Sequence, residues 1–205
     1  MSQNPDRPAA GGTTLVLLVG VALGAVMGLY LPFVAITLQA RGLAPAAVGI
    51  VLAISAAVQL IAAPAWGQAA DLRLGRARAL SVVCLGAGVA VACMIVAPAA
   101  WIVGGLVIVT ASFTTAFNAL SDAITVNLRP DPRAYVRIRI WLSVAYAATS
   151  FAGGIAYAAT DLTLALVLFG SGCFAVALLA TRLPDRALAP RSEEHTSELQ
   201  SRLHL

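Results

Sequence analysis

Residues 67–78 read Gly-Gln-Ala-Ala-Asp-Leu-Arg-Leu-Gly-Arg-Ala-Arg, the first dense cluster of charge in the chain. One apolar run precedes this stretch and another follows it. A helix needs roughly 20 apolar residues to cross a bilayer, and each of the two runs meets that requirement. The stretch therefore indicates a short charged loop between two membrane spans.

The composition is that of a membrane protein. In the 205-residue chain 60% of the residues are hydrophobic and 11% are charged, and the mean hydropathy is +0.89. Soluble domains carry about 25% charged residues. The apolar runs are continuous and do not alternate, which favours helices over a barrel. We expect an all-α integral membrane protein with six spans: Thr13–Leu38, Ala46–Ala70, Ala79–Ala97, Ala99–Asn127, Ile138–Ala159 and Leu162–Leu183.

The arginines predict the orientation, since the chain has no lysine. With a cytoplasmic N-terminus, Arg41 alone lies on the far side of the membrane. Ten arginines then fall on the cytoplasmic side: Arg7, Arg73, Arg76, Arg78, Arg129, Arg133, Arg137, Arg139, Arg182 and Arg186. Because positive loops stay in the cytoplasm, we expect a multi-pass protein of the inner (plasma) membrane with its N-terminus inside. Headgroup contacts explain the pI of about 9.4 without a nucleic-acid partner.

Asp122 lies inside the fourth predicted span, where a charge costs about 2.5–3.5 kcal/mol at the membrane centre. It lies seven residues before Arg129, and Arg139 of the fifth span lies six residues after Arg133. At 1.5 Å per residue both charges sit about 9–10 Å in from the same loop, which predicts an Asp122–Arg139 ion pair. Each residue belongs to a polar stripe at helical spacing: Thr114, Asn118, Asp122 and Thr125, and Arg139, Ser143, Tyr146 and Ser150.

Two interpretations of this pair remain open. It could line a water-filled cavity and contact a polar or anionic substrate or a proton, or it could fasten two helices together. Three isolated polar residues, Tyr30, Ser55 and Gln59, could face the same cavity. Arg137 points to another face and is interpreted as a snorkelling residue, and Trp141 as an interfacial anchor.

The small residues and cysteines suggest packing and not chemistry. Gly20, Gly24 and Gly28 stand four apart, a spacing that lets helices approach closely in lipid. The cysteines, Cys84, Cys93 and Cys173, have no zinc-binding spacing. We therefore expect neither a metal nor a cofactor.

Three blocks of the chain resemble the N-terminal half of a major facilitator superfamily transporter, over about Leu15–Leu183: Gly28–Phe33, Pro64–Arg78 and Tyr135–Trp141. They look most like the lactose-permease and phenylpropionate-permease branch of proton symporters. The resemblance implies six helices, arranged as 3+3 inverted repeats, that form one half of a twelve-helix fold. Such transporters bind substrate near the midplane and work by alternating access.

The resemblance also implies roles for individual residues. Leu120–Ala123 is similar to the family's acidic site, so Asp122 and Arg139 are expected to contact substrate. The substrate or proton pathway then takes in four residues of the two stripes: Asp122, Arg139, Asn118 and Tyr146. The charged loop is expected to gate the cytoplasmic side through Gly67, Asp71, Gly75, Arg76 and Arg78. Three residues, not the family's usual two, separate Asp71 from Gly75, so Arg73, Arg76 and Arg78 all remain candidates for the basic roles.

We therefore expect a secondary active transporter for a small polar or anionic solute, coupled to protons by symport. Two alternatives remain: a homodimerising half-transporter, and a membrane-embedded enzyme. The enzyme would need a dense Asp/His/Glu constellation at the membrane face, which Asp71, Asp122 and Asp131 do not make.

The ends of the chain suggest a fragment. Residues 1–12 are expected to form a cytoplasmic tail, 13–183 the six-helix membrane unit and 184–190 the start of a central cytoplasmic loop. Residues 191–205 contain all three glutamates and both histidines, and 191–201 look like an in-frame translation of a sequencing adapter. We interpret 191–205 as a non-native tail, so that the missing partner is the transporter's C-terminal half.

Overall fold

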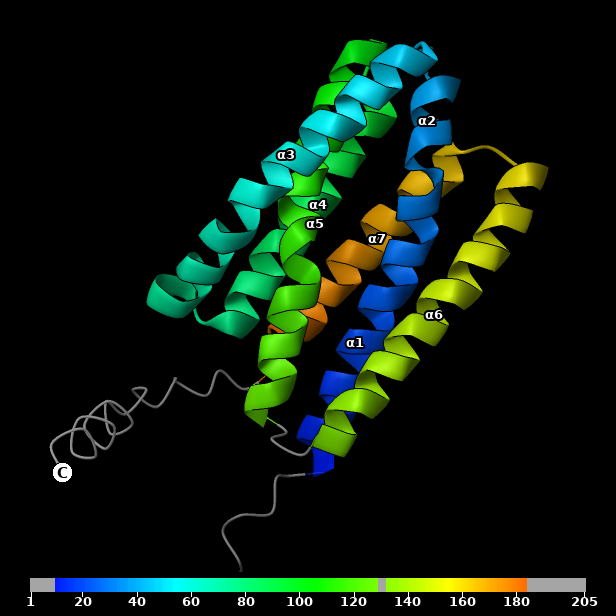
Figure 1. Cartoon of the computed structure of the whole chain (residues 1–205). Helices are drawn as coiled ribbons and strands as arrows, with labels where there is room; N and C mark the ends of the chain where they lie inside the picture. Colours follow the sequence, from blue (N-terminus) through cyan, green and yellow to red (C-terminus); the bar gives the residue numbers. More distant parts are fainter. Residues whose placement is uncertain (1–9, 129–131, 184–205) are drawn as a thin grey trace, which may run out of the picture.

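The computed structural model describes residues 10–128 and 132–183, shown in Figure 1. Every element in this part of the chain is helical: α1 (Ala10–Tyr30), η1 (Leu31–Phe33), α2 (Val34–Ala40), α3 (Pro45–Ala69), η2 (Ala70–Leu74), α4 (Arg76–Val96), α5 (Ala100–Leu128), α6 (Pro132–Ala159) and α7 (Thr163–Ala180). Six helical segments of this part of the chain are long and apolar enough to cross a membrane. The first of them runs from α1 to the end of α2. The all-α, six-span prediction is confirmed. Of the expected tail at 1–12, residues 1–9 lie outside the described residues, as do the expected loop at 184–190 and the expected non-native tail at 191–205.

The predicted span boundaries differ from the observed helices by a few residues. Helix α1 begins at Ala10, inside the expected tail, and α6 begins at Pro132, well before the predicted Ile138. The described arginines gather at the end of the bundle where α6 begins and α7 stops, whereas Arg41 lies at the opposite end (Figure 1). We call the first of these ends the arginine-rich end.

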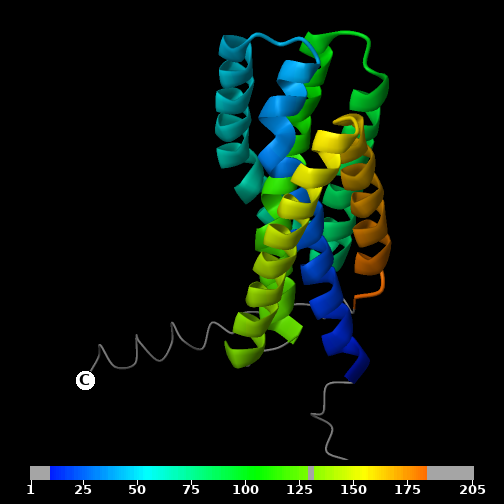
Figure 2. The same ribbon diagram turned by 90° about the vertical axis from the view of Figure 1, so that its right-hand side faces the viewer.

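The helices pack in a symmetric pattern. The first span packs on α6 and α3 packs on α5, while α4 lies between α5 and α7, and α7 also contacts α1. Exchanging the first three spans for the last three reproduces this set of neighbours. Figure 2, a quarter turn from Figure 1, shows the same bundle from the side of α6. This is the arrangement that 3+3 inverted repeats produce.

A proline interrupts the first span in its second half. Pro32 has no backbone N–H, so the carbonyl of Gly28 loses the partner that a continuous helix would supply. Ser150 of α6 donates its hydroxyl to this carbonyl at 3.1 Å. Two more α6 hydroxyls bind α1 carbonyls: Thr149 to Ala25 at 2.9 Å and Tyr157 to Leu29 at 3.1 Å. The two helices are therefore joined by hydrogen bonds where the helix is interrupted.

Glycines of α1 allow α6 to pack closely against the helix near its interruption. A Cβ atom on Gly24 would run into the backbone of Leu142, and one on Gly28 would meet the backbone carbonyl of Tyr146. Close approach is therefore possible only without side chains at these positions, as the four-residue spacing predicts.

Burial is uneven around the bundle. In an apolar 18-residue stretch of each span, only 11% of the residues of α3 and of α6 are buried, against 33–56% in the other four spans. The core lies between α1, α4, α5 and α7, with Phe117, Phe169, Leu23, Leu80 and Met94 among its fully enclosed side chains. Helices α3 and α6 flank this core at opposite edges of the bundle (Figure 1). Their apolar side chains are left facing outward.

Candidate functional site

A cavity of about 290 Å³ lies between the first span, α3 and α5. Gln59 lies halfway along the span Pro45–Leu74, so the cavity is at mid-depth. Its apolar side is formed by Met27, Leu31, Val34, Leu52, Val107 and Ala111, together with the ring of Tyr30. Its polar side is formed by Ser55, Gln59, Thr114, Thr115 and Asn118. Hydroxyls and amides opposite an apolar wall are what ligand pockets typically present.

The tertiary structure unites residues that are far apart in the sequence. Asn118, a predicted pathway residue, lines the cavity together with Tyr30, Ser55 and Gln59, the three isolated polar residues of the spans. The ring of Tyr30 packs on Phe169, with centroids 4.4 Å apart, which fixes that wall. Ser55 donates its proton to the carbonyl of Val51 at 2.8 Å, so its oxygen is left to act as an acceptor.

The predicted stripe on α5 does not continue through Thr125. This residue is 1% exposed and donates its hydroxyl to the carbonyl of Ser121 at 2.8 Å, inside the core. Thr125 is thus buried whereas Asp122 is half-buried, because three residues place Thr125 about 60° around the helix from Asp122, toward the core.

Asp122 and Arg139 form an ion pair between α5 and α6. Arg139 Nη1 lies 3.3 Å from Asp122 Oδ1, and the two side chains are 42% and 31% exposed, respectively. These two helices otherwise touch little along their length, so the pair bridges an open side of the bundle. Neither residue lines the cavity. Asp122 lies one helical turn from Asn118, about 6 Å toward the arginine-rich end.

Tyr135 is a further member of this charge site. It stands one turn before Arg139 on α6, and its side chain lies near the Asp122 carboxylate. Arg139 bonds to the carboxylate, and Tyr135 lies beside it on the same helix face. The i, i+4 spacing of Tyr135 and Arg139 was the signal that could have identified it from the sequence.

The other predicted positions on α6 lie away from the ion pair. Tyr146 is half-buried and neither lines the cavity nor joins the ion pair, and its carbonyl faces Gly28. Ser150 is engaged with the same glycine's carbonyl, and Ser143 is exposed. The α6 stripe therefore divides into a charged end and an end that contacts α1.

The charged loop between α3 and α4 contains a π-helical turn, Ala70–Leu74. A π-turn accommodates one residue more than an α-turn, and it stands where three residues replace the expected two. Gly75 ends the turn with φ +79°, a conformation that side chains rarely adopt. At Gly67 a Cβ atom would meet nothing within 4 Å among the described residues, so packing inside the bundle does not require that glycine.

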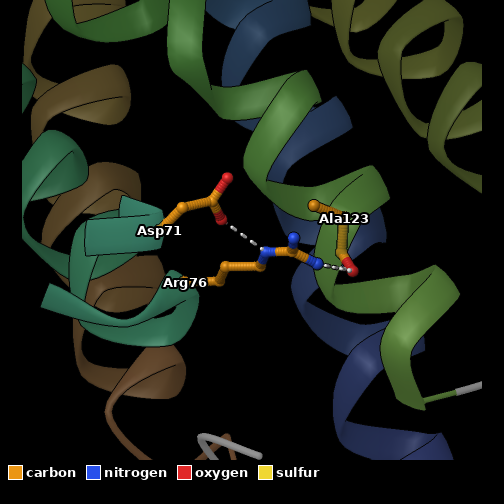
Figure 3. A network of polar contacts seen from close by, with 3 residues as sticks. All are labelled: Asp71, Arg76 and Ala123. Atoms are coloured by element: carbon orange, nitrogen blue, oxygen red, sulfur yellow. Dashed lines mark hydrogen bonds and ion pairs between the residues drawn. The ribbon is translucent and has the colours of Figure 1, made fainter. Parts of the chain in front are cut away.

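Arg76 connects this loop to α5, as Figure 3 shows. Its Nε lies 3.1 Å from Asp71 Oδ1, and its Nη1 donates to the carbonyl of Ala123 at 3.3 Å. Ala123 is the residue after Asp122, so the loop touches α5 directly beside the ion pair. Arg76 thus bridges the loop and α5, and Arg73 and Arg78 are exposed.

Within the described ranges, no three His, Cys, Asp or Glu side chains stand close enough together to hold a metal ion. The model of the MFS_1 like family matches residues 22–201. A search of curated proteins and a search of solved structures each found no match.

Proposed function

This chain belongs to the MFS_1 like family of the major facilitator superfamily, a family of membrane transporters, and we propose that it moves a small polar or anionic solute by proton-coupled symport. The proposal includes placement in the inner (plasma) membrane with the N-terminus in the cytoplasm. The observation that carries it is the mid-depth cavity, whose Asn118 lies one helical turn along α5 from Asp122, a member of the half-buried ion pair with Arg139 of α6.

The two parts of the site have different tasks in this proposal. Gln59 and Asn118 supply amide donors and acceptors to the solute, and the cavity hydroxyls add further hydrogen bonds. Arg139 offers a forked donor to a carboxylate or a hydroxyl group of the solute. Asp122 accepts the proton when the solute draws Arg139 away, since an unpaired carboxylate at this depth favours its neutral form.

Alternating access requires a second wall for the cavity. The sparsely buried helices α3 and α6 flank the site, and they expose large apolar side chains such as Leu60 and Phe151, 80% and 74% exposed. We propose that these faces meet a second six-helix unit, the C-terminal half of the transporter. A second copy of this chain is the alternative occupant, and it corresponds to a homodimerising half-transporter.

The loop is proposed to act as the gate of the arginine-rich end. Arg76 holds Asp71 and α5 together, and Gly75 allows the tight turn. Gly67 and Arg78, the other predicted loop residues, lie on the helices that flank it. A change at this loop is transmitted to α5 beside Asp122, which would link gating to the charge site.

Uptake measurements test this function directly. Cells expressing the chain from its complete gene are given labelled neutral and anionic solutes, with and without a pH gradient. We expect accumulation of at least one class that collapses with the gradient and with Asp122→Asn. The matched control is Asp161→Asn, an exposed aspartate at the opposite end of the bundle. Uptake unaffected by the gradient would rule out proton symport, and chemical conversion of the solute would point to an enzyme.

A further inference from the structure

The side chains of the mid-depth cavity narrow the class of solute that it can hold. Every side chain of the described lining is uncharged, and the polar members on its polar side are all hydroxyls or carboxamides. Asp122 and Arg139 lie outside this lining and bond to each other. An ionised group that leaves water for a largely apolar site loses its hydration, which is costly where no opposite charge replaces it. The lining therefore favours an uncharged solute.

The two carboxamides of the cavity are available to a solute. Gln59 belongs to α3 and Asn118 to α5, and these two helices pack against each other. Within the described ranges, neither amide hydrogen-bonds to another group of the protein. Each amide offers a carbonyl acceptor and two N–H donors. A carboxamide on the solute carries the same groups, so it can exchange a donor and an acceptor with either side chain.

Two hydroxyls of the cavity act as acceptors. Ser55 donates its proton to the carbonyl of Val51 at 2.8 Å, and Thr114 donates its proton to the carbonyl of Ala111 at 3.4 Å. Their oxygens keep lone pairs but have no proton left to donate. A solute that matches them must supply N–H or O–H groups. An ionised carboxylate has acceptors alone and does not match.

The apolar wall and the volume set the rest of the solute. Met27, Leu52 and Val107 stand on the apolar side of the cavity, together with the ring of Tyr30. The volume of about 290 Å³ corresponds to roughly ten water molecules at about 30 Å³ each. That is the room for a small ring with one substituent. The ring would lie against the apolar wall and the substituent against the polar one.

We propose that the solute held in this cavity is an uncharged amphipathic molecule, a small apolar ring that bears a carboxamide. This solute class rests on the proposed transport function and narrows it from polar or anionic solutes to neutral ones. The carboxamide bonds to Gln59 and Asn118, and its N–H groups supply the donors that Ser55 and Thr114 require.

The test is saturation-transfer NMR of the protein expressed from its complete gene and placed in lipid nanodiscs, with benzamide and benzoate as probes at neutral pH. Signal from empty nanodiscs is subtracted. The probes share a ring and a planar head group and differ in charge. We expect benzamide to bind about tenfold more tightly, because benzoate leaves the acceptor oxygens of the cavity unpaired.

Cavity variants locate the binding. Gln59→Leu and Asn118→Leu should each weaken benzamide binding about fivefold, the effect of one lost hydrogen bond. Gln68→Leu is the matched control, since Gln68 is an exposed glutamine of the same helix outside the cavity lining. Equal losses in Gln59→Leu and Gln68→Leu would place the contact elsewhere and overturn the proposal.

The unchanged protein gives the decisive comparison. Benzoate binding as tightly as benzamide would overturn the proposal, and so would a lack of benzamide binding. Benzyl alcohol keeps the ring and a neutral polar group but not the amide, so equal binding of this probe would contradict the carboxamide. A preference for benzoate would leave gradient-driven uptake of an anion standing. Uptake unaffected by the gradient would remove proton symport and leave a preference for benzamide intact.

Discussion

Arg76 donates a hydrogen bond to the backbone carbonyl of Ala123 at 3.3 Å, and so joins the loop after α3 to the residue that follows Asp122. The same guanidinium pairs with Asp71 at 3.1 Å. A side chain of the loop is therefore hydrogen-bonded to the α5 backbone at the residue next to Asp122. In the gating proposal, movement of either one displaces the other.

Replacing Arg76 should remove the hydrogen bond that connects the charged loop to α5 beside Asp122. We expect Arg76→Gln to lower the free energy of unfolding by about 1–2 kcal/mol. The substitution removes the ion pair with Asp71, which contributes little because it is half exposed, and the charged hydrogen bond to Ala123. Uptake should fall while insertion is retained. Arg73→Gln removes the same charge from the same loop without these contacts, and equal effects of both variants would show that only the loop's charge matters.

The ion pair of α5 and α6 should be needed for transport. Asp122→Asn and Arg139→Gln are each expected to abolish uptake, with some instability because each leaves the partner charge unpaired. The readouts are solute uptake and the amount of protein in the membrane. Normal transport by both single variants would place the pair outside the solute path, and rescue by the double neutral variant would make its role structural.

The contact between α1 and α6 should depend on Gly24. Gly24→Leu is expected to destabilise the protein by about 1–3 kcal/mol, because the new side chain overlaps the backbone of Leu142. Gly105→Ala on α5 is the control, since its Cβ meets nothing within 4 Å, and it should raise helix stability slightly. Thermal unfolding in detergent measures both. A tolerated Gly24→Leu would contradict the close packing.

Asp161 should stabilise the start of α7 in a pH-dependent way. Hydrogen bonds from the backbone N–H and the hydroxyl of Thr163 hold the pKa of the Asp161 carboxyl below its usual value, and the charge of Arg41 acts in the same direction. A lowered pKa gives stability that is present above the unfolded value, about 3.9, and is lost as pH falls through the folded value. Asp161→Ala should therefore melt earlier at pH 7, and the difference should shrink below about pH 4. A constant difference at all pH values would exclude the ionised carboxylate as the cause.

The orientation can be tested with cysteines at the two ends of the bundle. On a background lacking Cys84, Cys93 and Cys173, Arg73→Cys and Thr160→Cys place single thiols at exposed positions on opposite ends. An impermeant maleimide applied to intact cells should label the second and spare the first, because the arginine-rich end is predicted to be cytoplasmic. The reverse pattern would invert the topology.

The helical spans and the Asp122–Arg139 pairing were accessible from the sequence. Hydropathy and the rise of a helix are properties of a single segment, so they place a residue at a depth without knowledge of its neighbours. Both members of the pair lie at similar distances from one loop, and charges at this depth need partners. The pattern of charges likewise led to Arg76 as one of three candidates, although not to its bond with Ala123.

What only the tertiary structure decided is the rotation of each helix about its own axis. In a membrane both the core and the lipid side are apolar, so hydropathy does not tell which face turns inward. Pro32 and the α1 glycines set how α1 meets α6, and that contact engages Ser150 instead of exposing it. Packing of α5 turned Thr125 into the core while leaving Asn118 in the cavity. The depth of a residue in the membrane depends on its own segment of the chain. The direction in which its side chain points depends on how side chains of several helices pack together.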